Sequence, residues 1–370
     1  MRALGAIGLM SGTSLDGVDV ALLRTDGERI EHFGPSGYRP YGEAERALLR
    51  RALQEAATLS DRTTRPSILA EAEALVTRAH AEAVESLMSA HRLSPQDIDV
   101  VGFPGQTVIH RPAQRLTVQI GDGRLLAQRL GIAVVYDFRA ADIAAGGEGA
   151  PLTPVFHRAM AQTLDRPPPL AVLNIGGVAN LTYVDRDRDP VACDTGPGNA
   201  LIDDFMRART GASCDVDGGA AACGRPDHAF VARLLAHPFF ERKPPKSLDR
   251  NTFAFPDPGL PQFSVPDGAA TLAALTVEAV VRVVPHLPET PRTWIVSGGG
   301  ARNRTLMRML AQRLAPATVE TADQVGWSAA AFEAQAFAYL AVRALCGLPI
   351  TFPGTSGAPR PLSGGVIVRP

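Results

Sequence analysis

Residues 8–19, GLMSGTSLDGVD, place small hydroxyl side chains and two carboxylates between two apolar runs. A strand, a tight turn and a returning strand would present backbone N–H groups and hydroxyls at one point, which suits phosphate oxygens. Carboxylates beside phosphate suit an accompanying Mg²⁺. The turn is not a Walker A loop, because Val18 and Asp19 stand where Lys and Ser or Thr are required. Spacing alone leaves two interpretations open, a phosphate-binding turn or an ordinary hairpin, since Asp-Gly is itself a hairpin signal.

Two further glycine-rich turns, 175–180 and 297–300, also follow apolar runs that are expected to be strands. Each one alone is more often a plain turn. Three such turns in one chain favour a nucleotide whose phosphates lie between two lobes. A dinucleotide-binding Rossmann fold is excluded, because no GxGxxG opens a helix after the first strand.

Asp194 follows the apolar run 191–193 and precedes a turn of small residues, Thr-Gly-Pro-Gly. A carboxylate at the end of a strand is well placed to act as a general base. The alternative is structural: Asp194 could cap the helix expected near Asn199, or brace the turn.

Three more side chains are candidates for substrate binding, and two of them have a structural alternative. Gln106 follows a strand and a Pro-Gly turn, and its amide suits sugar hydroxyls. Arg139 could clamp a carboxylate or phosphate bidentately, or form an ion-pair cluster with Asp137 and Asp142. Glu333 stands among apolar residues near the start of the last long helix, either at a pocket wall or on the wet face.

Composition limits the class of protein. A chain of 370 residues exceeds the usual size of a single core, so we expect two domains. The formal net charge of -1 argues against partners such as nucleic acid or an anionic membrane surface. The four cysteines have no metal-ligand spacing, and neither a signal peptide nor an 18-residue apolar span is present, so we expect a cytoplasmic protein. The only lysines, Lys243 and Lys246, are expected to be exposed loop charges.

Hydrophobic periodicity predicts alternating strands and helices, and therefore an α/β fold. Strands are expected at 97–103, 116–120, 132–136, 170–175, 179–184 and 293–296, besides the two arms of the 6–23 hairpin; helices are expected at 43–58, 66–91, 124–130, 152–164, 200–210, 268–284, 303–314 and 328–346. The stretch 237–267 is rich in proline and is expected at the surface. Asp-Arg-Pro-Pro-Pro at 165–169 is the clearest break in the chain. We expect an N-terminal lobe at 1–150 and a C-terminal lobe at 151–345, with the tail 346–370 packing back on the first.

Together these segments resemble the anhydro-N-acetylmuramic acid kinase family over essentially the whole chain. The motifs that carry the resemblance are GLMSGTSLDGVDVAL (8–22), GQTVIHRP (105–112), QIGDG (119–123), DFRAADIAAGGEGAPLTP (137–154), LNIGGVANLT (173–182), DTGPGNALID (194–203), PPKS (244–247), SGGGARNRTLM (297–307) and EAQAFAYLA (333–341). The chain departs from the family at Pro104, where a His is usual before Gly-Gln-Thr, at 248–251, where Thr-Gly-Arg-Glu is common, and at 327–332, which lacks the expected acidic residues.

The resemblance implies two actin-like ATPase lobes, each a ribonuclease H-like mixed sheet flanked by helices, with an inter-lobe cleft that holds ATP and Mg²⁺. The implied nucleotide-binding residues are Ser11, Gly12, Thr13, Ser14, Asp16, Gly17, Asp19, Gly176, Gly177, Asn180, Gly298, Gly299 and Asn303, with Asp16 as a ligand of the magnesium. Gln106, Arg139 and Glu333 match positions that line the sugar pocket.

The activity that the resemblance implies is an ATP-dependent conversion of 1,6-anhydro-N-acetylmuramic acid to N-acetylmuramic acid 6-phosphate and ADP, in murein recycling. Asp194 matches the catalytic base, which acts on the water that opens the anhydro ring. The family is expected to form homodimers. Two alternatives remain at this stage: a kinase of the same superfamily that acts on another sugar, and a chaperone-like ATPase that uses the same lobes without a sugar.

Overall fold

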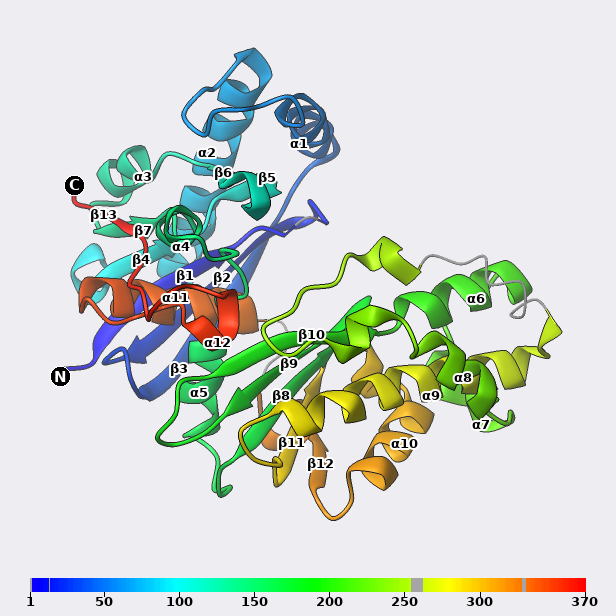
Figure 1. Cartoon of the computed structure of the whole chain (residues 1–370). Coiled ribbons are helices and arrows are strands. Elements are labelled where there is room, and N and C mark those ends of the chain that lie inside the picture. The colour runs from blue at the N-terminus through cyan, green and yellow to red at the C-terminus, as the bar shows by residue number, and fades with distance from the viewer. Residues whose placement is uncertain (1, 13, 254–261, 328–330) are drawn as a thin grey trace. The chain divides into compact units, whose positions relative to one another are not determined.

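In the computed structural model the chain forms two compact units, residues 1–163 with 330–370, and residues 164–329 (Figure 1). The structure describes residues 2–12, 14–253, 262–327 and 331–370. These boundaries differ from those we expected, 150/151 and 345/346. The later boundary differs because helix α11 (Phe332–Leu345) packs on strands of the first unit instead of belonging to the second. The earlier one differs because helix α5 (Pro154–Ala161), which contacts α11, also belongs to the first unit. The first unit is therefore built from both ends of the chain.

The first unit contains a six-stranded mixed sheet. Its strand order is β13 (Val366–Val368), β7 (Val134–Tyr136), β4 (Val100–Phe103), β1 (Leu4–Met10), β2 (Gly17–Thr25) and β3 (Ile30–Pro40). Strands β1, β4 and β7 run parallel, whereas β2, β3 and β13 are antiparallel to their neighbours. The β1–β2 hairpin has the expected position, and its register pairs Met10 with Asp19 across the turn. The C-terminal tail adds the sixth strand.

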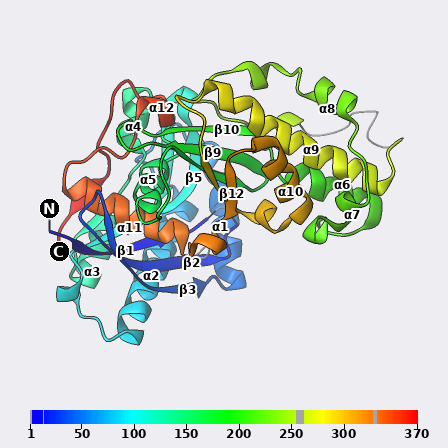
Figure 2. The ribbon, with the colours of Figure 1, turned by 90° about the horizontal axis from the view of Figure 1, so that it is seen from below.

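Helices cover both faces of this sheet. Successive residues of β1 point to opposite sides, so neighbouring residues of this strand contact different helices. Ile7 and Leu9 pack in one core with α1 (Glu43–Ala56) and α2 (Ser67–Ala90). Gly8 faces α11, and the backbone approach is so close that a Cβ on Gly8 would lie 1.8 Å from the carbonyl oxygen of Ala334. Figure 2 shows α11 and α2 on opposite sides of the sheet.

The first unit also contains a short two-stranded sheet and several short helices. Strands β5 (Gln106–Arg111) and β6 (Leu116–Ile120) pair antiparallel. The helices are α3 (Gly123–Leu130), α4 (Ala140–Ala145), α5 (Pro154–Ala161) and α12 (Pro353–Ser356). Strands β4 and β7 end next to the Pro-Gly and Asp-Phe-Arg segments, which places both candidate segments at the carboxyl edge of the sheet, where α/β folds bind ligands.

The second unit contains a five-stranded mixed sheet with the order β10 (Val191–Pro197), β9 (Val178–Val184), β8 (Leu170–Ile175), β11 (Thr293–Ser297) and β12 (Thr318–Thr321). Strands β8, β11 and β12 are parallel, and β9 and β10 are antiparallel to their neighbours. The order and directions repeat those of β3-β2-β1-β4-β7 in the first unit. Two mixed sheets of the same plan confirm the predicted α/β class. The cleft between the lobes stays a prediction.

The second unit is closed by the helices α6 (Ala200–Thr210), α7 (Gly219–Ala222), α8 (His228–Leu234), α9 (Val265–Val283) and α10 (Arg304–Leu314). Among the described residues one helical segment, Val265–His286, has the length and mean hydropathy (1.5) of a membrane span. Of its apolar stretch 72% is buried, and Leu272 and Val280 belong to the core of the second unit. The helix is therefore a core element.

The expectation for residues 237–267 was wrong in part. Within its described portion, Phe239 and Phe240 belong to the core, and Lys246 is 3% exposed. Lys246 donates a hydrogen bond from Nζ to the Phe239 carbonyl and lies 4.4 Å from the centre of the Phe239 ring. Lys246 is therefore a buried cation, and the expectation of an exposed loop charge is corrected.

A buried histidine in the first unit predicts a pH dependence of stability. His80 on α2 is 0% exposed, and burial lowers its pKa to about 4. As the pH falls from 6.5 toward 4, the unfolded chain binds a proton at this site that the native protein does not. The free energy of unfolding should therefore fall by about 2–3 kcal/mol over this window.

The variant His80→Leu should show a shallower loss of stability between pH 6.5 and 4 in urea unfolding, with exposed His91→Gln as the control. Parallel curves for the wild type and His80→Leu would refute this assignment.

Candidate functional site

The first turn is held from behind by buried hydrogen bonds. Ser11 donates from Oγ to Gln106 Oε1 over 2.6 Å, and Gln106 Nε2 donates to the Gly12 carbonyl over 3.2 Å. Tyr41, which directly follows β3, has its hydroxyl 3.1 Å from Ser11 Oγ. Leu15 has a left-handed backbone (φ 55°) and buries its side chain in the core. The turn is thus anchored by side chains on its inner side. Thr13, a predicted phosphate contact, lies outside the described residues.

The position of Gln106 differs from that of an open sugar-pocket residue. Its side chain is 1% exposed, and both ends of its amide are bonded to the first turn. Gln106 therefore links strand β5 to the turn. The second N–H of Nε2 remains as the donor through which the amide could reach a substrate.

Negative charge gathers on the outer side of the same turn. Ser14 donates to Asp16 Oδ1 over 2.8 Å, and Asp16 is exposed. Asp19 is half-buried at the start of β2, and burial together with the nearby Asp16 and Glu333 raises its pKa to about 6. These mutually repelling carboxylates favour the approach of a cation.

The described residues contain no group of three or more His, Cys, Asp or Glu side chains close enough to hold a metal ion alone. That finding fits Mg²⁺, which commonly takes one or two carboxylates and completes its shell with phosphate oxygens and water. The residues present therefore suit a metal that arrives with a nucleotide. A permanently bound structural metal would need more ligands.

Glu333 and Arg139 lie in the first unit and interact electrostatically. The Glu333 side chain reaches solvent from the first turn of α11, but the protein around its carboxyl reduces hydration and raises its pKa, while Arg139 acts in the opposite direction. Arg139 donates to the Gly149 carbonyl over 2.6 Å, and burial lowers its pKa. Asp142 accepts from the Gly149 N–H over 2.6 Å. Arg139 and Asp142 thus hold the glycine loop 146–150 together.

The alternative of a mutual cluster of Asp137, Arg139 and Asp142 is only partly realised. Asp137 pairs with Arg62 at 2.5 Å, whereas Asp142 also accepts a hydrogen bond from Ser356 over 2.7 Å. These contacts leave Arg139 oriented by the backbone of the glycine loop. Such a fixed guanidinium suits recognition of an anionic or hydroxyl-rich ligand.

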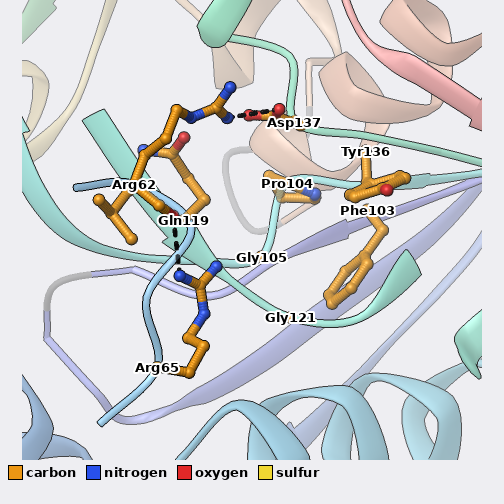
Figure 3. Close-up of a pocket in the computed structure, with 10 residues that line it drawn as sticks. Arg62, Arg65, Phe103, Pro104, Gly105, Gln119, Gly121, Tyr136 and Asp137 are labelled. Atoms are coloured by element: carbon orange, nitrogen blue, oxygen red, sulfur yellow. Dashed lines mark hydrogen bonds and ion pairs between the residues drawn. The ribbon is translucent and has the colours of Figure 1, made fainter. Parts of the chain in front are cut away.

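Beside this segment the first unit has a pocket with about 400 Å³ of open space, partly continuous with solvent (Figure 3). Its lining residues are Arg62, Arg65, Phe103, Pro104, Gly105, Val118, Gln119, Gly121, Tyr136 and Asp137. Figure 3 shows the Arg62–Asp137 ion pair at its rim. Pro104, which stands where the family usually has His, forms part of the wall, so this departure changes the lining of the pocket.

The second turn, in the second unit, is held by backbone contacts. The N–H groups of Gly198 and Asn199 donate to the carbonyls of Gly177 and Gly176 over 2.9 and 2.7 Å. Asn199 Nδ2 also donates to the Ile175 carbonyl over 3.1 Å. Asn180 is half-buried on β9 and lies opposite Asp194 in the register. The second turn and the Asp194 strand are therefore fixed to each other.

The predicted glycines fall into two groups according to what a Cβ would meet. At Gly12, Gly176 and Gly177 the nearest atoms would lie 3.5, 3.6 and 3.7 Å away, so the protein itself does not require glycine there. Glycines in such open positions allow a ligand to approach the backbone closely. At Gly17 a Cβ would lie 2.5 Å from the Arg39 carbonyl oxygen and 2.6 Å from the Tyr38 ring. Gly17 therefore has a packing role.

The third turn has mainly structural contacts. Gly298 has φ 80°, and a Cβ there would lie 2.5 Å from Asn174 Oδ1; at Gly299 it would lie 2.9 Å from Asn199 Nδ2. Asn303 is 7% exposed and accepts the Leu306 N–H at the start of α10 over 2.9 Å. The contacts of Asn303 thus account for its side chain as a helix cap, and its predicted role at the nucleotide stays a prediction.

Asp194 does not stand at the end of its strand, as we expected, but within β10, at a bulge between Asp194 and Gly196. A bulge redirects side chains locally and is common beside active sites. Asp194 Oδ2 accepts the backbone N–H of Leu248 over 2.7 Å, and the Asp194 N–H donates to the Lys246 carbonyl over 2.9 Å. Lys246 of the PPKS segment therefore holds the backbone of Asp194, and Leu248, just after that segment, orients the carboxylate. Sequence reasoning missed this role, since a Pro-rich stretch carries no periodic signal.

The two kinds of glycine predict opposite outcomes for the same substitution. Gly12→Ala should leave the melting temperature near that of the wild type, because its Cβ would make only an ordinary contact with Ser14 Oγ at 3.5 Å. If phosphate approaches this backbone closely, the added methyl should weaken nucleotide binding about tenfold. Gly17→Ala should lower the melting temperature by several degrees through its clash with β3. Calorimetric titration and thermal unfolding measure the two effects. Undiminished nucleotide binding by Gly12→Ala would contradict a phosphate at this turn.

The Asp19 carboxylate is expected to lower the free energy of unfolding while serving the binding of Mg²⁺. Because its pKa is raised, the native state binds a proton more readily than the unfolded chain, so this site reduces stability as the pH rises from about 4 through 6. Asp19→Asn should increase the free energy of unfolding at pH 7.5 by about 1 kcal/mol after solvent screening. The same variant should need more Mg²⁺ for half-maximal turnover. A loss of stability at pH 7.5 would show that the carboxylate has another role.

Comparison with known proteins gives one consistent answer. The family model described as anhydro-N-acetylmuramic acid kinase matches residues 5–370. The protein of that name from Rhodopseudomonas palustris (strain BisB18) is 59% identical over 365 residues, covering 99% of this chain and 100% of the relative. Its counterpart from Bradyrhizobium diazoefficiens is 58% identical over 369 residues, with 99% and 100% covered. The chain therefore belongs to the anhydro-N-acetylmuramic acid kinase family.

Proposed function

We propose that this protein uses ATP and water to convert 1,6-anhydro-N-acetylmuramic acid to N-acetylmuramic acid 6-phosphate and ADP. Family membership over the whole chain supports the substrate and the reaction type. The observation that carries the mechanism is the placement of Asp194 at a strand bulge, with its carboxylate held by the Leu248 N–H. A fixed carboxylate at such a bulge is suited to remove a proton from water.

In this proposal the Asp194 carboxylate takes a proton from a water molecule that attacks the anomeric carbon. The bond between C1 and O6 breaks, C1 gains the hydroxyl, and O6 takes the γ-phosphoryl group of ATP. The balance is one ATP and one water consumed, with ADP and one proton released. Orientation of the base is supplied by the backbone around Asp194.

The two open glycine turns are the proposed sites of the nucleotide phosphates, through Gly12 in the first unit and Gly176 and Gly177 in the second. Phosphoryl transfer depends mainly on positioning and charge stabilisation. Asp16, with Asp19 behind it, is the proposed side of the first turn for magnesium. When bound, Mg²⁺ would neutralise charge on the phosphate oxygens.

The sugar is proposed to contact Arg139, Glu333 and the remaining N–H of Gln106, all in the first unit. Arg139 and Glu333 supply one donor and one acceptor, and both are held at the carboxyl edge of the first sheet or on the helix that covers it. We further propose a cytoplasmic homodimer that acts in the recycling of murein. Light scattering after gel filtration would establish the oligomeric state.

Asp194→Asn tests the proposed base. The amide keeps the size of the side chain and can still accept the Leu248 N–H, so folding and ATP binding should be retained. Turnover should fall by about 10²–10⁴-fold, the usual contribution of general base catalysis. Asp187→Asn, an exposed aspartate in the same unit, is the matched control and should keep wild-type turnover.

Mass analysis of the product gives the second part of this test. A gain of one phosphate and one water relative to the anhydrosugar is expected, whereas phosphate alone would indicate phosphorylation without ring opening. Near-normal kinetics of Asp194→Asn would remove Asp194 from the role of base.

A further inference from the structure

Tyr41 is bonded to both ends of the first turn. Its backbone N–H donates to the Asp16 carbonyl over 2.8 Å, and its hydroxyl lies 3.1 Å from Ser11 Oγ. The side chain is 1% exposed and belongs to the core that contains β1 and α2. Tyr41, the residue that follows β3, therefore links Ser11 at one end of the turn to Asp16 at the other.

The direction of this hydrogen-bond chain follows from the protons available. Gln106 Oε1 is a carbonyl oxygen and can only accept, so Ser11 must donate to it. A serine hydroxyl has one proton, which is thereby used. The contact between Ser11 and Tyr41 must then run from the Tyr41 O–H to Ser11 Oγ.

The orientation of the Gln106 amide is fixed by the same reasoning. Its Nε2 donates to the Gly12 carbonyl. A flipped amide would place two carbonyl oxygens face to face at Gly12, with no proton between them. The hydrogen bonds therefore all run in one direction: Tyr41 donates to Ser11, Ser11 donates to the Gln106 amide, and the amide donates to the turn at Gly12.

Burial makes this hydrogen-bond network costly to break. Ser11 is 4% exposed and Gln106 is 1% exposed, so water does not readily replace a lost partner. Burial also raises the pKa of Tyr41 to about 12, which keeps the phenol protonated as a donor at physiological pH. The network is thus a fixed feature of the folded state.

We propose that Tyr41 is a positioning residue that makes the first turn and the Gln106 amide one rigid assembly, and that the Ser11 hydroxyl serves this assembly and does not donate to phosphate. This inference rests on the proposed function. It assigns to Ser11 a role different from the predicted phosphate contact. Since Gln106 is a proposed sugar contact and Gly12 a proposed nucleotide contact, loosening Tyr41 should weaken both ligands together.

Tyr41→Phe removes the donor and keeps the ring in the core. We expect the KM for ATP and the KM for the anhydrosugar each to rise about three- to tenfold, with faster hydrogen exchange of the amides in 11–16. In the Ser11→Ala background, Tyr41→Phe should add little, because the link is already cut. Tyr183→Phe, which removes a buried tyrosine hydroxyl bonded to Asp185 in the second unit, is the matched control and should leave both KM values unchanged.

The exchange measurement needs no substrate and therefore separates this inference from the proposed function. Absence of anhydrosugar turnover by the wild type would refute the proposed function, while faster exchange in 11–16 of Tyr41→Phe would still support the role of Tyr41. Wild-type exchange in 11–16, or effects of Tyr41→Phe and Ser11→Ala that simply add, would overturn the inference. A fall in melting temperature with unchanged exchange and unchanged KM values would also overturn it, since that pattern is purely structural.

Discussion

A turn that offers its backbone N–H groups to a ligand, as we propose for the first and second turns, must be held from its other side, because nothing on the ligand side can support it before binding. In the first unit side chains do this: Ser11, Tyr41 and Gln106 bond behind the turn, and Leu15 fixes it to the core. In the second unit backbone does it, through Gly198 and the following residue. Two equivalent hairpins thus meet one physical requirement by different means.

The two solutions have different costs. A side-chain network requires every polar group to be satisfied, since each unpaired buried group costs about 1–3 kcal/mol. A backbone clamp requires glycine where chains touch: a Cβ on Gly198 would lie 2.2 Å from the Gly176 carbonyl oxygen. The first turn can therefore be disrupted by removing a single hydroxyl, whereas the second is sensitive to any added carbon at one position.

Much of the fold could be predicted from the sequence, because its strands and helices have strong periodic patterns. The strands 116–120 and 170–175 and the helix 200–210 have the predicted bounds. Long-range packing could not be predicted in this way. The alanine-rich helix near the C-terminus has no local signal that assigns it to the first sheet, because that contact depends on Gly8, more than 300 positions earlier in the chain.

The candidate site shows the same limit. Sequence patterns indicated the turns and Asp194, since small residues and carboxylates after apolar runs are a local signal. They did not distinguish Gly12 from Gly17, because the difference is the presence of a neighbouring strand behind one of them. They also gave no role to Tyr41, whose phenol is separated from Ser11 by 30 positions in the sequence.

The composition of the first unit from both chain ends has a consequence for biosynthesis. On the ribosome, β1 and β4 emerge early, but α11, which covers one of their faces, is made only after residues 164–329. Domains generally fold as units while synthesis proceeds, so the second unit is complete while the first still exposes an apolar sheet face. We therefore expect an interval during synthesis in which this face of the first sheet is uncovered and open to non-native contacts, and which ends when α11 has been made.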